Sequence, residues 1–350
     1  MSWRSCRLGD VVTLKRGHDL PDQQRQPGDV PVVSSSGITG HHNEARAQAP
    51  GVITGRYGTL GEVFYLEEDY WPLNTALYVT DFKGNQPRFV AYFLEEVLST
   101  YQSDKAAVPG VNRNVLHELR VNCPDGETQG RIISVLSSYD DLIENNRRRM
   151  TLLEEAARQL YREWFVRLRF PGHEHPRIVD GVPDGWKRTE LGQSVTLNYG
   201  KALKADNRTE GPYPVFGSSG IVGSHDEALV AGPGIIVGRK GNVGSVYWCQ
   251  GGYWPIDTVY YVDAETSNLW LYHALKDMHF ISTDVAVPGL NRDFAYSRPL
   301  LVPSRPILRE FLRVVEPLFR QIDVLAQSNE RLRVARDLLL PRLMSGEIAV

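Results

Sequence analysis

The sequence has only three cysteines, and they have no paired spacing. Cys6, Cys123 and Cys249 lie far apart in a chain of 350 residues. This excludes a disulfide framework and a zinc site built on cysteine pairs, and it predicts reduced thiols in a cytoplasmic protein. No run of about 18 apolar residues is present, so we expect no membrane-spanning helix and no membrane partner. The N-terminal stretch MSWRSCRLGD lacks the apolar segment of a secretory signal.

The sequence also lacks the motifs of common catalytic sites. It has no GxxxxGK[ST] phosphate loop, no Pro-Pro dipeptide and no Glu followed two residues later by Lys. These absences argue against a standard ATPase, an amino-methyltransferase with an Asn/Asp-Pro-Pro-aromatic motif, and a common type of nuclease. The pairs His41–His42 and His173–His175 have no third ligand at a suitable spacing, so exposed loop histidines are favoured over a metal site. We therefore expect no catalytic residue, and no metal or cofactor bound by this chain.

A large excess of either charge is absent as well. The chain has 39 Lys and Arg against 42 Asp and Glu, a formal net charge of -3. Such a balance argues against an indiscriminate binder of polyanions, but it is compatible with a local basic cleft.

What the sequence does contain is a long internal repeat. Trp3 corresponds to Trp186 and Gly17 to Gly200, an offset of about 183 residues. At the same offset, PVVSSSGITGHHNEA corresponds to PVFGSSGIVGSHDEA, and YWPLNTALYV corresponds to YWPIDTVYYV. Further along, AVPGVNRN corresponds to AVPGLNRD at an offset of about 179 residues. The chain is therefore interpreted as a tandem duplication.

Each repeat has two parts of different character. The first part is rich in Gly, Pro and aromatic residues, and its short runs such as GVITG and GIIVGR predict strands bounded by glycine turns. Short helices are expected at 88–100 and 268–278, whereas 128–168 and 305–345 have almost no glycine and predict long helices. The predicted fold class is α+β, with two similar α/β lobes in a pseudo-twofold tandem repeat, separated by an antiparallel pair of long coiled-coil helices. The predicted divisions are a first lobe at 1–124, a first long helix at 125–169, an exposed linker at 170–185, a second lobe at 186–303 and a second long helix at 304–350.

The long helical segments carry apolar residues at alternating spacings of three and four, which is typical of a coiled-coil seam. Asn146 and Asn329 are polar residues within this seam and correspond to each other in the repeat. We expect them to lie near each other at the middle of the pair, because a buried polar residue needs a partner. Beyond Asn329 the seam blurs, since Arg333 and Arg336 fall where apolar residues are wanted. The residues assigned to the seam centre are Ile143, Asn146, Met150, Leu153, Ile322, Ala326 and Asn329.

A glycine frame occurs once in each lobe, as GRYGTLGEV from Gly55 and as GRKGNVGSV from Gly238. The frame follows a predicted strand and leads into another strand, so the helix N-terminus that would hold a pyrophosphate is missing. A nucleotide site is therefore excluded. The glycines are expected to permit tight turns and close backbone approach.

Three further motifs give the chain a family resemblance. DGVPDGW opens the second lobe, LIENNRRRMTLLEEAARQLYREWFV covers 142–166, and LLLPRLMSGEI covers 338–348. Together with the order lobe, helix, lobe, helix, they resemble the specificity subunit of type I restriction-modification enzymes over nearly the whole chain. The resemblance implies that each lobe is a target recognition domain that reads one half of a bipartite site in double-stranded DNA.

The same resemblance implies the partners and the cofactors. The helices would set the gap between the half-sites and dock two modification subunits, which bind S-adenosylmethionine and methylate adenine. A restriction subunit that uses ATP and Mg would join this core where the host has one. The specificity subunit itself would be cytoplasmic and non-catalytic, in agreement with the missing catalytic motifs.

The candidates for DNA contact are loop residues of both lobes. Residues that differ between the repeats, such as Tyr57 against Lys240, are the better base-reading candidates, whereas shared arginines suit phosphate contact or lobe structure equally well. An Asn can pair with adenine and an Arg with guanine, although the shared pairs 112–113 and 291–292 leave a structural role equally open. In the first lobe the candidates are Lys15, Arg16, Arg25, Ser35, Ser36, His41, His42, Arg56, Tyr57, Thr59, Asn74, Asn112 and Arg113. In the second lobe they are Lys201, Lys204, Arg208, Ser218, Ser219, Ser224, His225, Arg239, Lys240, Asn242, Asn291 and Arg292.

Two alternatives stay open at this point. The first is a non-catalytic, two-lobed carbohydrate-binding or scaffold protein, since Trp71 and Trp254 could stack on sugars, although core packing is the favoured role for both. The second is an enzyme whose site has no recognisable motif. The long helical spacer and the cytoplasmic pattern of cysteines favour the DNA-binding interpretation.

Overall fold

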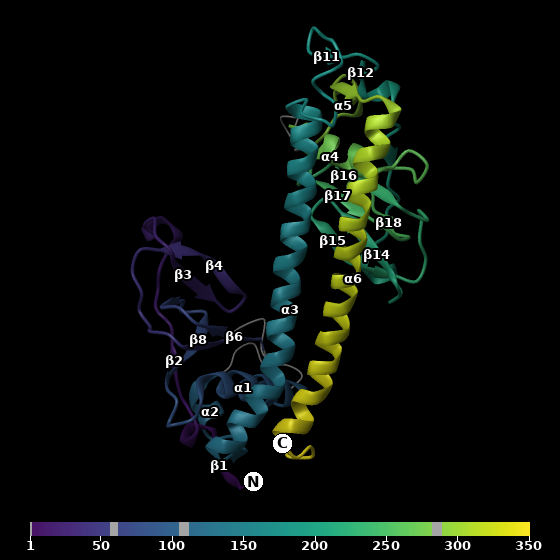
Figure 1. Cartoon of the computed structure of the whole chain (residues 1–350). Coiled ribbons are helices and arrows are strands. Elements are labelled where there is room, and N and C mark those ends of the chain that lie inside the picture. Colours follow the sequence, from purple (N-terminus) through teal and green to yellow (C-terminus); the bar gives the residue numbers. More distant parts are fainter. Residues whose placement is uncertain (1, 57–61, 105–111, 282–288) are drawn as a thin grey trace. The chain divides into compact units, whose positions relative to one another are not determined.

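The computed structural model describes residues 2–56, 62–104, 112–281 and 289–350 of the chain (Figure 1). The backbone separates into two units. The first unit consists of Met1–Asn145 and Ser328–Val350, and the second unit is Asn146–Gln327. Each unit therefore holds the lobe of one repeat together with a stretch of both long helices.

The lobe of the first unit contains an antiparallel sheet, a mixed sheet and one separate pair of strands. Its four-stranded sheet has the order β2-β8-β5-β6, and its three-stranded sheet has the order β4-β3-β7, with β7 parallel to β3. The strands are β1 Trp3–Arg7, β2 Thr13–Arg16, β3 Val30–Ser34, β4 Gly37–His42, β5 Gly51–Gly55, β6 Val63–Leu66, β7 Trp71–Pro72, β8 Ala76–Asp81 and β9 Arg120–Pro124, which pairs with β1. The helices are η1 Leu8–Asp10, η2 Asp22–Gln24, α1 Pro87–Asp104 and α2 Arg113–His117.

The second lobe repeats this plan strand for strand. Its four-stranded sheet has the order β13-β19-β16-β17, and its three-stranded sheet has the order β15-β14-β18. The strands are β12 Lys187–Glu190, β13 Asn198–Tyr199, β14 Tyr213–Gly217, β15 Gly220–His225, β16 Gly234–Gly238, β17 Val246–Cys249, β18 Trp254–Pro255, β19 Val259–Val262 and β20 Pro299–Val302, which pairs with β12. The helices are η4 Leu191–Gln193, η5 Ala205–Asn207, α4 Leu269–Asp277 and α5 Arg292–Tyr296. Equivalent cis peptide bonds precede Pro50 and Pro233. The shared plan confirms the predicted duplication and the predicted α+β class.

Strand β5 has the sequence GVITG and is buried along its whole length. All five of its residues are buried, because both faces of its sheet are covered. Val52 belongs to the cluster that includes α1 residues such as Leu94, whereas its neighbour Ile53 belongs to a cluster with Val33 of β3 and Tyr78 of β8. The short helix predicted at 88–100 is this α1, and the one predicted at 268–278 is α4.

The two long helices are α3, Gly126–Tyr161, which continues as the π-helix Arg162–Val166, and α6, Arg305–Met344. Within the first unit, Asn329 Nδ2 donates to Ile143 O at 3.2 Å, and Arg336 pairs with Asp140 at 2.7 Å. The residue numbers rise on one helix as they fall on the other, so the stretches are antiparallel. In the second unit, Phe311 packs on Phe165 with ring centroids 4.9 Å apart, and Phe319 lines a cavity together with Thr151, which gives the same direction.

The seam agrees with the sequence prediction except at one residue. Ile143, Asn146, Ile322 and Asn329 are buried, and Met150 and Leu153 are half-buried. Ala326 is exposed, and Leu325 is buried instead. The prediction for Ala326 is therefore wrong: steps of three and then four from Ile322 reach Leu325 and Asn329, which buries the larger apolar side chain. Asn146 and Asn329 belong to different units, so their proximity stays a prediction.

Arg336, at which the seam blurs, joins the helix pair to the first lobe. Its side chain is half-buried and pairs with Asp140 of α3. The other carboxylate oxygen of Asp140 accepts a hydrogen bond from the hydroxyl of Tyr92 on α1 at 2.5 Å. A polar link among α1, α3 and α6 thus replaces the apolar seam contact expected at this position, and it satisfies a carboxylate that would be costly to bury alone.

The segment 170–185 is more ordered than the predicted exposed linker. It contains the short hairpin β10 Ile178–Val179 and β11 Val182–Pro183. Phe170 at its start is buried against Trp186, with ring centroids 5.0 Å apart. The prediction of an exposed connection is therefore wrong at this residue, because the aromatic ring buries apolar area that the Pro and Gly content does not reveal.

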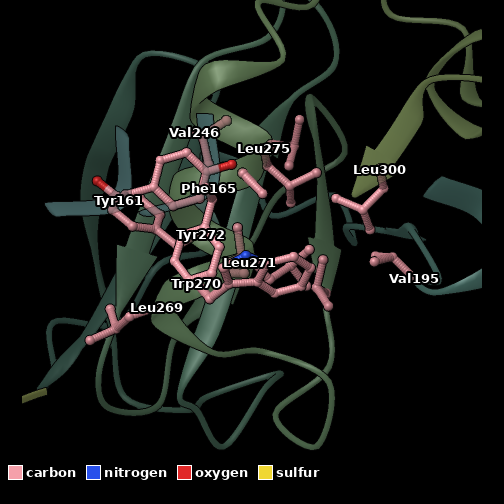
Figure 2. Close-up of a cluster of buried hydrophobic side chains, with 14 of the residues drawn as sticks. Tyr161, Phe165, Val195, Val246, Leu269, Trp270, Leu271, Tyr272, Leu275 and Leu300 are labelled. Carbon is pink, nitrogen blue, oxygen red and sulfur yellow. The ribbon is translucent and has the colours of Figure 1, made fainter. Parts of the chain in front are cut away.

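Aromatic rings dominate the core of the second unit, where α3 meets α4. Figure 2 shows Tyr161 of α3 and Phe165 of the π-helix that follows it, with Trp270 and Tyr272 of α4 in this cluster. His273 lies beside them, 4% exposed, with its ring 5.7 Å from that of Tyr161. Neither ring nitrogen of His273 has a hydrogen-bond partner among the described residues. Burial, with the nearby charges of Lys276 and Arg158, lowers the pKa of His273 to about 3.

The His273→Phe variant is expected to lose much of its sensitivity to acid. Since the folded pKa lies below the unfolded value of about 6.5, unfolding takes up a proton as the pH falls from about 6.5 towards 3, and stability falls in that window. At pH 5 the loss amounts to about 2 kcal/mol of unfolding free energy. Urea unfolding at pH 7.5 and at pH 5 measures the difference, and His175→Phe on the exposed linker serves as a control. An unchanged pH dependence in His273→Phe would contradict the assignment.

Candidate nucleic-acid interface

In the first lobe, three loops meet at one end of the four-stranded sheet. Asn74 N donates to His18 O at 3.0 Å, and Arg56 N donates to Thr75 O at 3.1 Å. Arg16 Nε donates to Asn74 O at 3.3 Å. The structure thus brings together the predicted residues Arg16, Arg56 and Asn74, and Lys15 is exposed beside Arg16 on β2.

A further cation in this region is Arg46, which the sequence analysis missed. Its guanidinium lies 4.9 Å from the ring centroid of Trp71. The pKa of His18 is lowered by burial first and then by the charges of Lys15 and Arg46, so both cations lie near this histidine. Comparison of the repeats could have found Arg46, because its counterpart is Leu229 and residues that differ between the lobes were the base-reading candidates.

In the second lobe, the predicted residues Arg239 and Arg292 meet on one ring. Their guanidinium carbons lie 5.2 Å and 5.0 Å from the ring centroid of Tyr199. Leu290 N donates to Arg239 O at 2.8 Å, and Lys240 forms a β-bridge with Gly289, so the two backbone segments are joined. The sequence analysis missed Tyr199, because its two arginine neighbours are distant from it in the sequence.

The glycine frame of the second lobe forms the tight loop that the sequence predicted. Gly244 N donates to Gly238 O at 2.9 Å, and Gly241 and Gly244 have φ values of +80° and +76°. A Cβ atom on Gly238 would lie 2.1 Å from Asn242 O, so this position requires glycine. Asn242 is exposed in this loop. The matching candidates Tyr57 and Thr59 of the first lobe lie outside the described residues.

The turns of two hairpins contribute hydroxyl groups. Ser36 and Ser219 are exposed, and Ser35 and Ser218 are half-buried, in the β3–β4 and β14–β15 turns. Ser245 Oγ donates to Ser218 O at 2.7 Å, which ties the glycine loop to the hairpin of the second lobe. On the following strands His41 is exposed and Ser224 is half-buried.

The two histidines at the ends of these strands are internal, so their prediction as DNA contacts is wrong. His42 and His225 are 6% and 8% exposed. Their Nδ1 atoms accept hydrogen bonds from Gln26 N at 3.0 Å and Thr209 N at 3.1 Å. Each ring lies edge-on to a buried tryptophan, with centroids 5.2 Å apart in both lobes. The alternation of side chains along β4 and β15 turns these histidines inward.

Arg25 and Arg208 correspond to each other in the repeat, and each donates a hydrogen bond to a hairpin strand, β4 or β15. Their NH1 groups donate to Thr39 O at 3.0 Å and to Val222 O at 2.6 Å. Arg25 also pairs with Asp22 at 2.7 Å. These bonds assign both arginines to lobe structure instead of base reading. Lys201 and Lys204 of the same loop are exposed, and Lys201 Nζ lies 5.8 Å from the ring centroid of Trp254.

Asn112 and Asn291 are helix N-caps, which supports the structural role that the sequence left open beside pairing with adenine. Asn112 Oδ1 accepts from Asn114 N at 3.0 Å, and Asn291 Oδ1 accepts from Asp293 N at 2.8 Å. A bidentate contact with adenine needs this oxygen. The neighbouring Arg113 is exposed and keeps its candidacy for DNA contact.

Two other kinds of site are absent from the part of the chain that the structure describes. Within the described residues, no group of three or more His, Cys, Asp or Glu side chains could hold a metal ion. None of the described helices combines the length and the apolar character needed to cross a bilayer.

Comparison with known proteins gives the family. The model described as "Type I restriction modification DNA specificity domain" matches residues 2–155 and 183–333, one match for each repeat. The chain belongs to this family. Its two repeats are therefore DNA specificity domains, and the chain recognises DNA sequence as a non-catalytic specificity subunit, as the resemblance implied.

The relatives are distant but cover most of the specificity subunit. The chain is 24% identical to the type I restriction enzyme MjaIX specificity subunit of Methanocaldococcus jannaschii, over 74% of this chain and 68% of that one. It is 22% identical to the HindI specificity subunit of Haemophilus influenzae, over 71% and 73%. The crystal structure of the type I system S subunit from M. genitalium has the same fold, with a TM-score of 0.58 at 18% identity over 98% of this chain and 96% of that one.

Proposed function

We propose that this specificity subunit recognises a bipartite site in duplex DNA, with one lobe reading each half. One observation supports the proposal most. The two lobes have the same fold, but they display different sets of cations and polar groups at equivalent positions. Arg56 with Arg239 and Arg113 with Arg292 occupy shared positions, which suits contact with the uniform phosphate backbone. Lys240, Asn242, His41 and Arg46 differ from their counterparts, which suits contact with different bases.

The helices would set the gap between the half-sites and dock two modification subunits. Exposed apolar side chains on α3 and α6 support docking, since Leu152, Val324 and Leu338 are 69%, 64% and 65% exposed. The modification subunits would bring S-adenosylmethionine to methylate adenine in the cytoplasm. A restriction subunit with ATP and Mg would join where the host encodes one.

The carbohydrate-binding alternative finds no support. Trp71 and Trp254 are buried in their lobes, as favoured from the sequence, so their ring faces are not displayed for sugar stacking. Each indole ring instead makes a cation–π contact, Trp71 with Arg46 and Trp254 with Lys201.

Substitution of neighbouring residues tests the division between base reading and phosphate contact. Lys240→Ala is expected to relax discrimination at one position of one half-site by about 1–3 kcal/mol, because an exposed amine can read a base edge. Arg239→Ala is expected to weaken binding to all sequences and to reduce the salt dependence, because it would remove a phosphate contact. Affinities of the complex with its modification subunits, measured against half-site variants at two salt concentrations, separate these outcomes. Identical behaviour of the two variants would refute the division.

A further inference from the structure

Tyr199 of the second lobe is an exposed tyrosine that lies beside two arginines. The side chain is 51% exposed, although it belongs to the four-stranded sheet. Two guanidinium groups, those of Arg239 and Arg292, lie within cation–π distance of its ring at 5.2 Å and 5.0 Å. Two like charges beside one ring repel each other, and the negative face of the ring offsets part of that repulsion.

A buried tyrosine, Tyr260, supports the ring of Tyr199. Tyr199 packs on Tyr260 with ring centroids 5.1 Å apart, and Tyr260 is buried. The hydroxyl of Tyr260 donates to Leu290 O at 3.1 Å, which fixes the segment that leads to Arg292. Burial, followed by a hydrogen bond with Tyr199, raises the pKa of Tyr260 to about 12, so this support is neutral at physiological pH.

The two arginines differ in how much of their hydrogen-bonding capacity is used. Arg239 donates from Nε and NH2 to Asp257 O, at 3.3 Å and 2.8 Å. Arg292 makes no hydrogen bond or ion pair with the described residues, and its contacts are with the rings of Tyr199 and Tyr296. An arginine oriented by aromatic rings keeps its N–H groups for a ligand, and its planar fork matches an oxyanion such as phosphate.

The first lobe has an arginine instead of an aromatic residue at this position. The counterpart of Tyr199 is Arg16, whose Nε donates to Asn74 O at 3.3 Å. The counterparts of Arg239 and Arg292 are Arg56 and Arg113. The first lobe therefore has three arginines where the second has two arginines and a tyrosine.

We infer that Tyr199 is a positioning residue that holds Arg239 and Arg292 against the DNA phosphate backbone at the second half-site. The inference rests on the proposed function, since it assumes that this face of the lobe contacts DNA. Tyr199 acts through the arginines and reads no base. Its replacement therefore lowers affinity for all sequences, and the recognised sequence stays the same.

Three variants of the chain, each assembled with its modification subunits, test this inference. Tyr199→Phe keeps the ring and is expected to bind within about twofold of the wild type. Tyr199→Leu keeps the bulk but removes the ring, and it is expected to lose about tenfold in affinity for every duplex. The slope of log Kd against log salt is expected to fall by about one phosphate contact. Arg292→Ala is expected to reproduce the Leu variant, and the double variant to add little further loss.

The possible failures are distinguishable. A wild-type complex without sequence-dependent binding to duplex DNA would overturn the proposed function itself. If the wild type binds but Tyr199→Leu keeps the wild-type salt slope, the inference about phosphate positioning is wrong, whether or not affinity falls. A Tyr199→Leu variant with altered half-site preference would show instead that the ring contacts bases. Rescue by Phe together with a reduced slope in the Leu variant supports the inference.

Discussion

Replacement of residues 1–124 by the corresponding lobe of another specificity subunit is expected to change one half of the methylated target and to leave the other half unchanged. The reason is that the lobes have separate cores. The core of the first unit joins β2, β5 and β8 to α1, whereas the core of the second unit joins β16 and β19 to α4. Methylome sequencing of cells that carry the chimera together with its modification subunits measures the result.

A second chimera controls for damage at the new junction. The first lobe packs on Ile132 and Leu136 of α3 and on Leu343 of α6, and Tyr92 bonds to Asp140. A swap of 1–124 alone leaves these helix residues facing a foreign lobe, so lower stability is expected. A chimera that also exchanges 126–145 and 328–350 restores the matched contacts and should give the same new half-site with higher stability. Changes in both halves of the target, or in neither, would contradict the modular account.

Insertion of one heptad into both long helices is expected to lengthen the gap between the half-sites without altering them. Seven residues add roughly 10 Å of helix, about three base pairs of B-DNA. Positions 145/146 in α3 and 327/328 in α6 are suitable, because the two units meet in the sequence at these points. A heptad preserves the apolar spacing of both helices.

The matched control for this experiment is an insertion in α3 alone. That variant lengthens α3 but not α6, so the pairs Ile143–Asn329 and Phe165–Phe311 cannot both keep their register, and a loss of stability and methylation is expected. The methylated motif of the double insertion gives the gap directly. If the double insertion methylates the original motif with its original gap, the helices do not set the spacing.

The architecture could be predicted well from the sequence, because the duplication gives each predicted element twice. A run such as GVITG recurs as GIIVG, and both are buried strands, since the same glycine and apolar spacing must satisfy the same two-sided sheet twice. The seam was predicted from spacing alone, which cannot separate Ala326 from Leu325 when both are apolar neighbours. Burial decided for the larger side chain.

The interface residues were harder to predict, because residue type does not reveal side-chain direction. His42 and Arg25 look like DNA contacts in the sequence, but one accepts a bond from a loop amide and the other donates to a strand carbonyl. Tyr199 was missed for the opposite reason. Its role follows from two arginines that are distant in the sequence and meet only when the sheet and the segment before α5 are in place.

Methylation mapping in the host with and without this gene shows whether two lobes of one chain read the two halves of one DNA site. We expect a methylated adenine motif with two different specific halves and an unspecified gap of fixed length. This motif should disappear when the gene is deleted and return when the gene is restored. A continuous motif, or methylation that persists unchanged after deletion, would contradict the account.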